Sequence, residues 1–331
     1  MTPFTYTRAA EPQQAVVELG LEPRGKLLGG GTNLIDLMKM GVETPTRIID
    51  INRMPLARIE ELPGGQGVRI GALARNSDVA DHPLIAERYP VLREALLSGA
   101  SPQLRNMATV GGNLLQRTRC PYFYDPTFPS CNKRQPGSGC GAIEGFNRSH
   151  AILGQSAQCI ATHPSDMCVA LAALDAAVQV RGPKGERRIP FADFHRLPGN
   201  TPDLETVLTH DEIVTAVDLP AKPAAKQSHY LKIRDRASYA FALVSVAAVL
   251  ERGTDGRITT ARLALGGVAH KPWRVPEAET ILQGKSADEA AFRAAADALL
   301  AGAKGYRHNT FKIELARRTI VRALTTTAAL A

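Results

Sequence analysis

Every cysteine of this chain lies between positions 120 and 168 of its 331 residues. The five are Cys120, Cys131, Cys140, Cys159 and Cys168. Their number is odd, and the N-terminal sequence MTPFTYTRAAEP has neither the apolar core of a secretory signal nor a twin arginine. We therefore expect no export signal on this chain and no framework built only of disulfides. The clustering instead predicts a metal centre or a reactive thiol, and the metal centre is the leading interpretation.

The sequence around these cysteines supports that interpretation. Between Arg117 and Gln158 the hydrophobic periodicity stops, and Pro, Gly, Ser, Asn and Arg become frequent. A stretch of about 40 residues without regular structure is rare inside a compact domain unless something else orders it. A metal cluster bound by the cysteines would order this insert, which spans about 117–158.

The rest of the chain has the mixture of short strand-like and helical segments that is typical of an α+β protein. Its length predicts two or three domains at about 150 residues each. In the first part we expect strands at 26–28, 47–51, 67–73 and 177–180, helices at 34–40 and 83–98, and a short strand leading from Cys159 into a helix that starts at Pro164-Ser165-Asp166.

The predicted domain boundary lies in the small, polar stretch AKPAAKQS. We expect a first domain at 1–220, a linker at 221–228 and a second domain at 229–331. The second domain begins with three strand-like runs and ends with helical segments at 286–302 and 310–324. A sheet followed by helices indicates a smaller α+β domain.

Composition excludes several classes of protein. The chain is 44% hydrophobic and 22% charged, without an apolar run long enough to span a bilayer, so we expect no membrane insertion. Its net charge of +8 would suit an anionic cofactor. The basic residues are scattered and only 5% of residues are aromatic, which argues against nucleic-acid binding.

Two glycine-rich loops are candidates for binding phosphate groups. The first, Gly29-Gly30-Gly31-Thr32-Asn33, follows a predicted strand and precedes a helix; the second is Ala108–Asn113. Loops without Cβ atoms let backbone N–H groups converge on a ligand. Each loop alone could be a tight turn, but two such loops suit an extended ligand with two phosphates. At 161–166 a nucleotide contact and simple helix capping by Ser165 or Asp166 remain alternatives, and His163 is interpreted as a turn residue.

Four segments together resemble a known family. The sequences KLLGGGTNLIDLMKMG, ATVGGNLLQ, HPSDM and YLKIRDRASYAFALVSVAAVL are similar, in order and across almost the whole chain, to the FAD-binding subunits of the molybdenum hydroxylases, the xanthine dehydrogenase family. The resemblance implies a two-lobed FAD-binding domain of the PCMH/vanillyl-alcohol-oxidase type, followed by a C-terminal domain of the CO dehydrogenase flavoprotein type. The cysteine insert resembles that of medium subunits with an additional [4Fe-4S] cluster, and is closer to aldehyde oxidoreductases than to 4-hydroxybenzoyl-CoA reductases.

The resemblance also implies a set of FAD contacts. It places Asp166 at the adenosine half of FAD and Lys232 beside the isoalloxazine ring, with a further contact at the strand Ile213–Thr215. Where some relatives have an aromatic residue before the second loop, this chain has Gly99-Ala100. The implied cofactor-binding residues are Lys26, Leu27, Leu28, Gly29, Gly30, Gly31, Thr32, Asn33, Leu34, Thr109, Gly111, Gly112, Asn113, Asp166, Val214, Thr215 and Lys232.

A [4Fe-4S] cluster needs four thiolates, and the chain has five cysteines. We assign Cys120, Cys131, Cys140 and Cys159 as ligands. Cys168 lies in an apolar helical run, where a thiol usually behaves as a small core residue. An assignment in which Cys168 replaces Cys159 is the alternative, and a zinc site is another, although zinc usually has paired C-x-x-C ligands.

The sequence contains no motif for acid–base or nucleophilic catalysis, so the chemistry belongs to the cofactor. The resemblance implies the FAD subunit of a heterotrimeric, molybdenum-dependent aldehyde oxidoreductase. Electrons would pass from a large molybdopterin-binding subunit through a small [2Fe-2S] subunit to FAD here and on to an external acceptor. A hydroxybenzoyl-CoA reductase type of subunit is one alternative; a cysteine-rich metal- or nucleic-acid-binding protein without flavin is another.

The resemblance bears on the compartment as well. Periplasmic aldehyde oxidoreductases leave the cytoplasm folded, together with a partner that carries the signal. We therefore expect a periplasmic protein exported with a signal-bearing partner, with the cytoplasm as the alternative.

Overall fold

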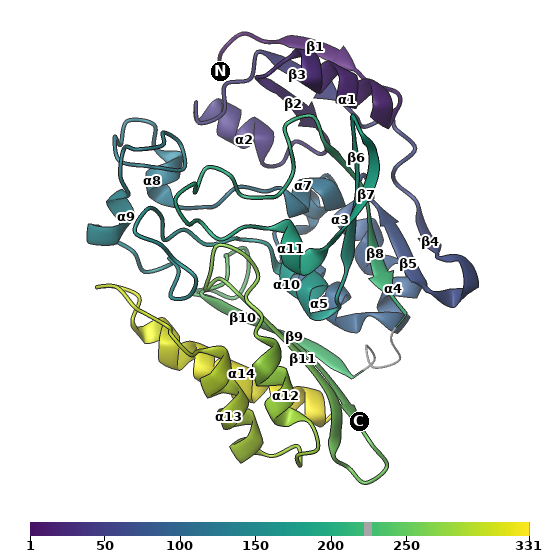
Figure 1. Ribbon diagram of the computed structural model, residues 1–331, viewed down its shortest axis with the longest axis vertical. Coiled ribbons are helices and arrows are strands. Elements are labelled where there is room, and N and C mark those ends of the chain that lie inside the picture. Colours follow the sequence, from purple (N-terminus) through teal and green to yellow (C-terminus); the bar gives the residue numbers. More distant parts are fainter. Residues whose placement is uncertain (222–226, 331) are drawn as a thin grey trace.

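A parallel three-stranded sheet forms the N-terminal lobe of the computed structural model, which describes residues 1–221 and 227–330 (Figure 1). β3 (Arg47–Asp50) is its central strand, flanked by β1 (Thr5–Arg8) and β2 (Gly25–Leu28). α1 (Pro12–Leu21) buries Ala15, Val16 and Leu19 in a small core with Ile49. α2 (Leu34–Lys39) follows the first glycine loop and ends, as predicted, before a glycine with positive φ, Gly41.

An antiparallel five-stranded sheet forms the second lobe. Its strand order is β4-β5-β8-β6-β7, so β8 pairs with β5, far earlier in the sequence. The strands are β4 (Ile59–Glu61), β5 (Gly67–Gly71), β6 (Ala177–Gly182), β7 (Gly185–Pro190) and β8 (Ile213–Pro220). A 3-10 turn at Pro63–Gly65 joins β4 to β5. The helices of this lobe are α3 (Asn76–Asp81), α4 (Pro83–Arg88), α5 (Pro90–Ser98), α6 (Pro102–Arg105), α7 (Val110–Leu114), α10 (Asp166–Ala173) and α11 (Phe191–Phe194).

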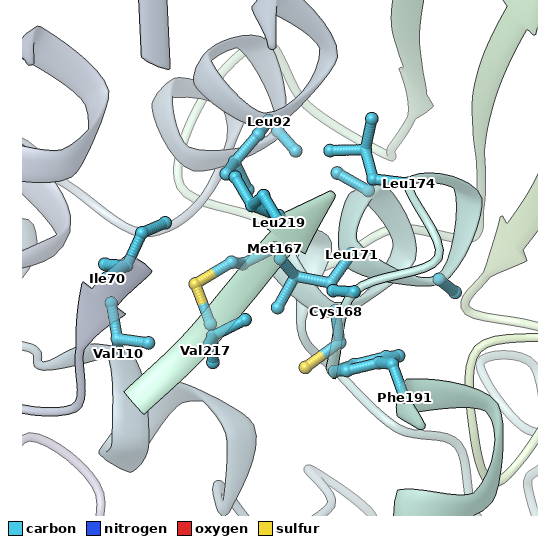
Figure 2. Packing of buried hydrophobic residues seen from close by; sticks show 14 of the residues in the cluster. Ile70, Leu92, Val110, Met167, Cys168, Leu171, Leu174, Phe191, Val217 and Leu219 are labelled. Carbon is cyan, nitrogen blue, oxygen red and sulfur yellow. The ribbon is translucent and has the colours of Figure 1, made fainter. Parts of the chain in front are cut away.

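α10 occupies the centre of the molecule, and all eight of its residues are buried. Figure 2 shows Met167, Cys168 and Leu171 of this helix packed with Val217 and Leu219 of β8. The apolar run therefore behaves as the sequence suggests. Cys168 is 0% exposed and belongs to the hydrophobic core.

The C-terminal domain is a three-stranded antiparallel sheet in the order β11-β10-β9, covered on one face by three helices (Figure 1). Its elements are β9 (Ser228–Ile233), β10 (Val244–Arg252), β11 (Ile258–Gly266), α12 (Pro276–Leu282), α13 (Glu289–Leu299) and α14 (Phe311–Ala328). α5 and α10 contact its strands as well, so the sheet joins the two domains. The predicted linker at 221–228 falls largely outside the described residues.

Two local predictions are wrong. The expected helix at 83–98 is divided into α4 and α5 because Pro90, which has no N–H, starts a new helix after Tyr89. The expected short strand at Cys159 is absent, since residues 158–165 have no regular structure. Isolated backbone bonds, such as those from Ala151 N to Ile160 O at 2.8 Å and from His163 N to the carbonyl of Ala269 at 3.0 Å, support that segment in place of a ladder.

The cysteine insert forms a separate lobe with little regular structure (Figure 1). It contains only two single-turn helices, α8 (Pro121–Tyr124) and α9 (Gly141–Glu144). Within residues 1–221 and 227–330, no helix is both long and apolar enough to cross a bilayer.

Candidate functional site

The two glycine loops lie in direct contact. A Cβ on Gly30 would sit 1.8 Å from the carbonyl oxygen of Met107, and one on Gly29 would sit 3.1 Å from Oγ1 of Thr109. Gly31 has a φ of +73°, which a side chain would strain. Glycine at these positions therefore allows the loop after β2 to pack against the loop before α7.

Thr109 fixes the second loop. Its hydroxyl accepts a hydrogen bond of 3.2 Å from the N–H of Gly112, which caps the short helix α7. Asn113 ties the loop to α10, because its Oδ1 accepts a bond of 2.6 Å from Oγ of Ser165. Ser165 in turn caps α10, accepting from the N–H of Cys168 at 3.0 Å. The capping interpretation of Ser165 is thus confirmed.

A first cavity of about 350 Å³ lies on one side of the loops. It is lined by every residue from Lys26 to Leu34, by Thr109, Gly111 and Gly112 of the second loop, and by Val214 of β8. Lys26 and Arg117 also line it, but both are ion-paired with Glu43, at 3.4 and 2.6 Å. The loops therefore offer backbone N–H groups more readily than free cations.

A second cavity of about 650 Å³ lies on the other side. Thr32, Asn33 and Gly112 line both cavities. The two cavities therefore form one elongated site, and the glycine loops lie where they meet. Of these two cavities, Asn113, Asp166 and Lys232 line the second and not the first. Thr215 lines neither, since its hydroxyl donates to the carbonyl of Gln179 at 3.2 Å.

Asp166 and Lys232 form a buried ion pair in the second cavity. Lys232 Nζ lies 2.8 Å from Asp166 Oδ2 and donates to the carbonyl of Ser98 at 3.0 Å. Tyr230 donates to the other carboxylate oxygen at 2.7 Å, and burial together with the Asp166 charge raises the pKa of Tyr230 well above its ordinary value. Asp166 and Lys232 thus line the same cavity, whereas Val214 lines the first. Their implied contacts with the two halves of FAD stay a prediction.

Two aromatic residues of the second cavity were not expected from the sequence. Tyr239 and Phe241 line it and are 56% and 52% exposed. Tyr239 has a φ of 52°, which is rare for a residue with a side chain. Gly99 and Ala100 line the same cavity. The sequence did contain a feature that could have predicted them, because the motif YLKIRDRASYAFALVSVAAVL places both aromatic residues shortly after Lys232.

The four cysteines assigned as ligands line one small cavity, and Cys168 does not. Cys131 and Cys140 face each other across an antiparallel bridge, while Cys120 precedes α8 and Cys159 lies on the extended segment before α10. Burial raises the pKa of Cys120 to about 12. A hydrogen bond between Cys140 and Cys159 lowers the pKa of Cys140 to about 6 and raises that of Cys159.

Polar contacts hold this insert in place. Lys133, whose side chain is 2% exposed, donates to Glu205 at 2.5 Å and to the carbonyl of Pro202 at 2.8 Å. Burial by itself would raise the pKa of Glu205, but the positive charges of Lys133 and Arg117 outweigh this effect and lower the pKa to about 2. Asn132 donates to the side chain of Gln158 at 2.8 Å. The insert thus depends on buried ion pairs and side-chain bonds more than on an apolar core.

No three of the four thiols of the insert have their sulfurs within 4.8 Å of one another. Tetrahedral zinc, with bonds of about 2.3 Å to sulfur, requires sulfurs about 3.8 Å apart. Among the described residues, the one set of three or more His, Cys, Asp or Glu with ligand atoms all within 4.8 Å is His163, Cys168 and His195. That set lies elsewhere, and its two imidazole rings pack edge to face.

A cavity of about 130 Å³, here called the connecting cavity, lies between the cysteines and the second cavity. It is lined by Cys120 and His150 on one side and by Asp166 and Phe241, which also line the second cavity, on the other. The cysteine site and the elongated site are therefore neighbours.

The two-domain fold and the glycine-loop site agree with two protein families that this chain matches. Residues 2–222 match the family described as the FAD binding domain in molybdopterin dehydrogenase, and residues 229–327 match the CO dehydrogenase flavoprotein C-terminal domain. The chain belongs to the family of FAD-binding subunits of the molybdenum hydroxylases, which are oxidoreductases, and this confirms the resemblance seen in the sequence.

Three individual proteins with similarity to this chain are members of enzymes with stated activities. The chain is 52% identical over 325 residues, covering 98% of both chains, to the aldehyde oxidoreductase FAD-binding subunit PaoB of Escherichia coli. It is 29% identical, over 96% of both chains, to the nicotine 6-hydroxylase medium subunit of Paenarthrobacter nicotinovorans. In structure it is similar to a chain of carbon monoxide dehydrogenase from Hydrogenophaga pseudoflava, with a TM-score of 0.77 and 28% identity over 100% of this chain and 99% of that one. The expected two-domain α+β fold is thereby confirmed.

Proposed function

We propose that this chain is the FAD-containing electron-transfer subunit of a molybdenum-dependent aldehyde oxidoreductase. The observation that carries the proposal is the contact between the two glycine loops, which lie where the two cavities of an elongated site meet. The 52% identity to PaoB of Escherichia coli supports aldehydes as the substrate class of the whole enzyme. The match over residues 2–222 favours this function over that of a metal- or nucleic-acid-binding protein without flavin.

The residues present fit FAD. Backbone groups of both loops would hold the pyrophosphate, and the smaller and larger cavities would take the adenosine and the isoalloxazine. When bound, FAD supplies chemistry that accepts and donates electrons singly or in pairs. Lys232 would place a positive charge at the ring, and Asp166 would hold that ammonium group in position.

A glycine substitution tests the FAD site. A Cβ on Gly112 would meet only Oγ1 of Thr109, at 3.0 Å, so the side chain of Gly112→Val would enter the space between the loops. We expect this variant to lose flavin while iron is retained, measured by flavin fluorescence and iron analysis. Gly20→Val is the matched control, because nothing lies within 4 Å of its Cβ position on α1. Unchanged flavin in Gly112→Val would exclude the proposed position of the pyrophosphate.

We further propose that Cys120, Cys131, Cys140 and Cys159 bind a [4Fe-4S] cluster. All four line one cavity, no paired C-x-x-C spacing typical of zinc links them, and Cys168 is in the core of the second lobe. Nearby positive charges on Lys133 and Arg117 would compensate the thiolate charge, although both are shared with Glu205. Iron analysis and low-temperature EPR of the reduced protein test this assignment.

The proposed partners are a large molybdopterin-binding subunit and a small [2Fe-2S] subunit. Support comes from the relatives, several of which are named medium subunits or medium chains of multi-subunit enzymes. Copurification of two further chains, one with molybdenum and one with iron, is the expected result. Recovery of this chain alone under the same conditions would argue against the assembly.

We also propose a periplasmic location, reached together with a signal-bearing partner. The only support is the resemblance of the insert to that of periplasmic aldehyde oxidoreductases. Cell fractionation tests it directly. Recovery of this chain with its large subunit in the cytoplasm would overturn the proposal.

A further inference from the structure

Of the four proposed cluster ligands, Cys120 is the one that lines the cavity next to the proposed flavin site. It lines both the cysteine cavity and the connecting cavity. Arg119, Asp166 and Phe241 line the connecting cavity together with the second cavity, so only a short stretch of protein separates Cys120 from the space assigned to the isoalloxazine. A side chain that forms a hydrogen bond to the sulfur of Cys120 therefore contacts the proposed cluster ligand on the side that faces the flavin cavity.

One side chain contacts that sulfur. Nε2 of His150 lies 3.1 Å from Sγ of Cys120, and His150 is 3% exposed. A cysteine bound to iron is a thiolate and can only accept a hydrogen bond, so the proton must be on Nε2. Nδ1 of His150 is buried without a partner among the described residues. Because His150 lines the connecting cavity, water there could satisfy this nitrogen.

The C-terminal domain holds His150 in this position. Lys312 of α14 is fully buried, and its ammonium group donates to the carbonyl of His150 at 2.8 Å. Asn309, also fully buried, donates to the same carbonyl at 3.2 Å. The backbone N–H of His308 donates to Oδ1 of Asn147 at 3.0 Å. Three contacts from a distant part of the chain therefore fix the segment that carries the imidazole.

We propose that His150 donates a hydrogen bond from Nε2 to the Cys120 ligand and thereby raises the reduction potential of the [4Fe-4S] cluster. The inference rests on the proposed cluster. Reduction adds negative charge that spreads onto the ligand sulfurs, and a donor at one sulfur stabilises the reduced state more than the oxidised state. His150 is a positioning and tuning residue, acting through Cys120 on the ease with which an electron reaches the flavin side.

The test is a potentiometric titration of the cluster, followed by EPR, in the assembled enzyme. His150→Leu removes the donor, and we expect the midpoint potential to shift to a more negative value. His150→Gln keeps an N–H donor of similar reach, and we expect a potential close to that of the unmodified protein. His82→Gln, which replaces a histidine between α3 and α4 in the second lobe, is the matched control. Equal potentials in all four proteins would overturn the proposal.

A second measurement on the unmodified sequence does not depend on the variants folding. In protein labelled with ¹⁵N-histidine, electron–nuclear double resonance of the reduced cluster should show coupling to one histidine nitrogen. Absence of that coupling would overturn the role of His150 while leaving the cluster in place. Absence of any iron–sulfur EPR signal would instead show that the cluster assignment itself is wrong.

Discussion

The ion pair between Asp166 and Lys232 is more buried than the pairs that Lys26 and Arg117 make in the first cavity. The two side chains are only 8% and 4% exposed, and Tyr230 satisfies the second carboxylate oxygen. The sequence identified both residues, but it could not show that they contact each other, because they lie on α10 and β9, far apart in the chain. Pairing across domains depends on tertiary packing that local sequence does not encode.

Removing the lysine alone should be costly. Lys232→Met leaves the Asp166 carboxylate buried without its cation, and we expect a loss of about 3–5 kcal/mol in the free energy of unfolding. The double variant with Asp166→Asn should recover much of that loss, since no unpaired charge remains. Denaturant unfolding of both proteins measures the difference. Equal destabilisation of the single and double variants would contradict the importance of the pair.

Glu205 should make stability depend on pH. Lys133 and Arg117 lower its pKa in the folded protein from an ordinary value of 4.5 to about 2, against the opposing effect of burial. A depressed pKa contributes stability above pH 4.5, and that contribution is lost as the pH falls towards 2. The difference in unfolding free energy between the unmodified protein and Glu205→Gln should therefore shrink by up to about 3 kcal/mol over this range. A difference independent of pH would contradict the argument.

The cysteine insert is the element whose order depends most on what it binds. Its sequence predicted both the lack of periodicity and the four candidate ligands. The ion pair from Lys133 to Glu205 was beyond sequence reasoning, because it joins the insert to a loop 72 positions later. Near the cysteines the apolar residues of the insert form a small cluster, in which Phe123 and Cys131 pack with Leu37, while Ile152 and Leu153 pack into the core of the C-terminal domain.

Substitution of single cysteines separates the cluster from the core. We expect Cys120→Ser, Cys131→Ser, Cys140→Ser and Cys159→Ser each to lose or degrade the [4Fe-4S] EPR signal and to make the insert sensitive to protease. Cys168→Ala should retain the signal and cost on the order of 1 kcal/mol, because it removes one small buried group. If Cys168→Ala abolished the signal and Cys159→Ser preserved it, the fourth ligand would be misassigned.

At the scale of the whole molecule, the proposed flavin site unites all three parts of the fold. The first glycine loop comes from the N-terminal lobe, the second loop and Asp166 from the second lobe, and Lys232 from the C-terminal domain. The order of the parts and most strands followed from sequence patterns and resemblance. The division of the site into two cavities did not, since it results from how loops of separate lobes meet.

Flavin should therefore stabilise the assembled fold. A ligand that binds only the folded state adds about 2.7 kcal/mol of stability when its concentration is 100 times its Kd. We expect the melting temperature of flavin-depleted protein to rise with added FAD, and that of Gly112→Val to remain unchanged. A melting temperature insensitive to FAD in the unmodified protein would show that the cofactor does not bind across the lobes.

The central claim is that one chain binds both cofactors at neighbouring but separate sites. Its most direct test is the content of FAD and iron in the purified chain, measured together with the visible spectrum. The account predicts about one FAD and about four iron atoms per chain, with flavin bands on a broad iron–sulfur absorption. A colourless protein, or a yellow one with zinc in place of iron, would contradict it.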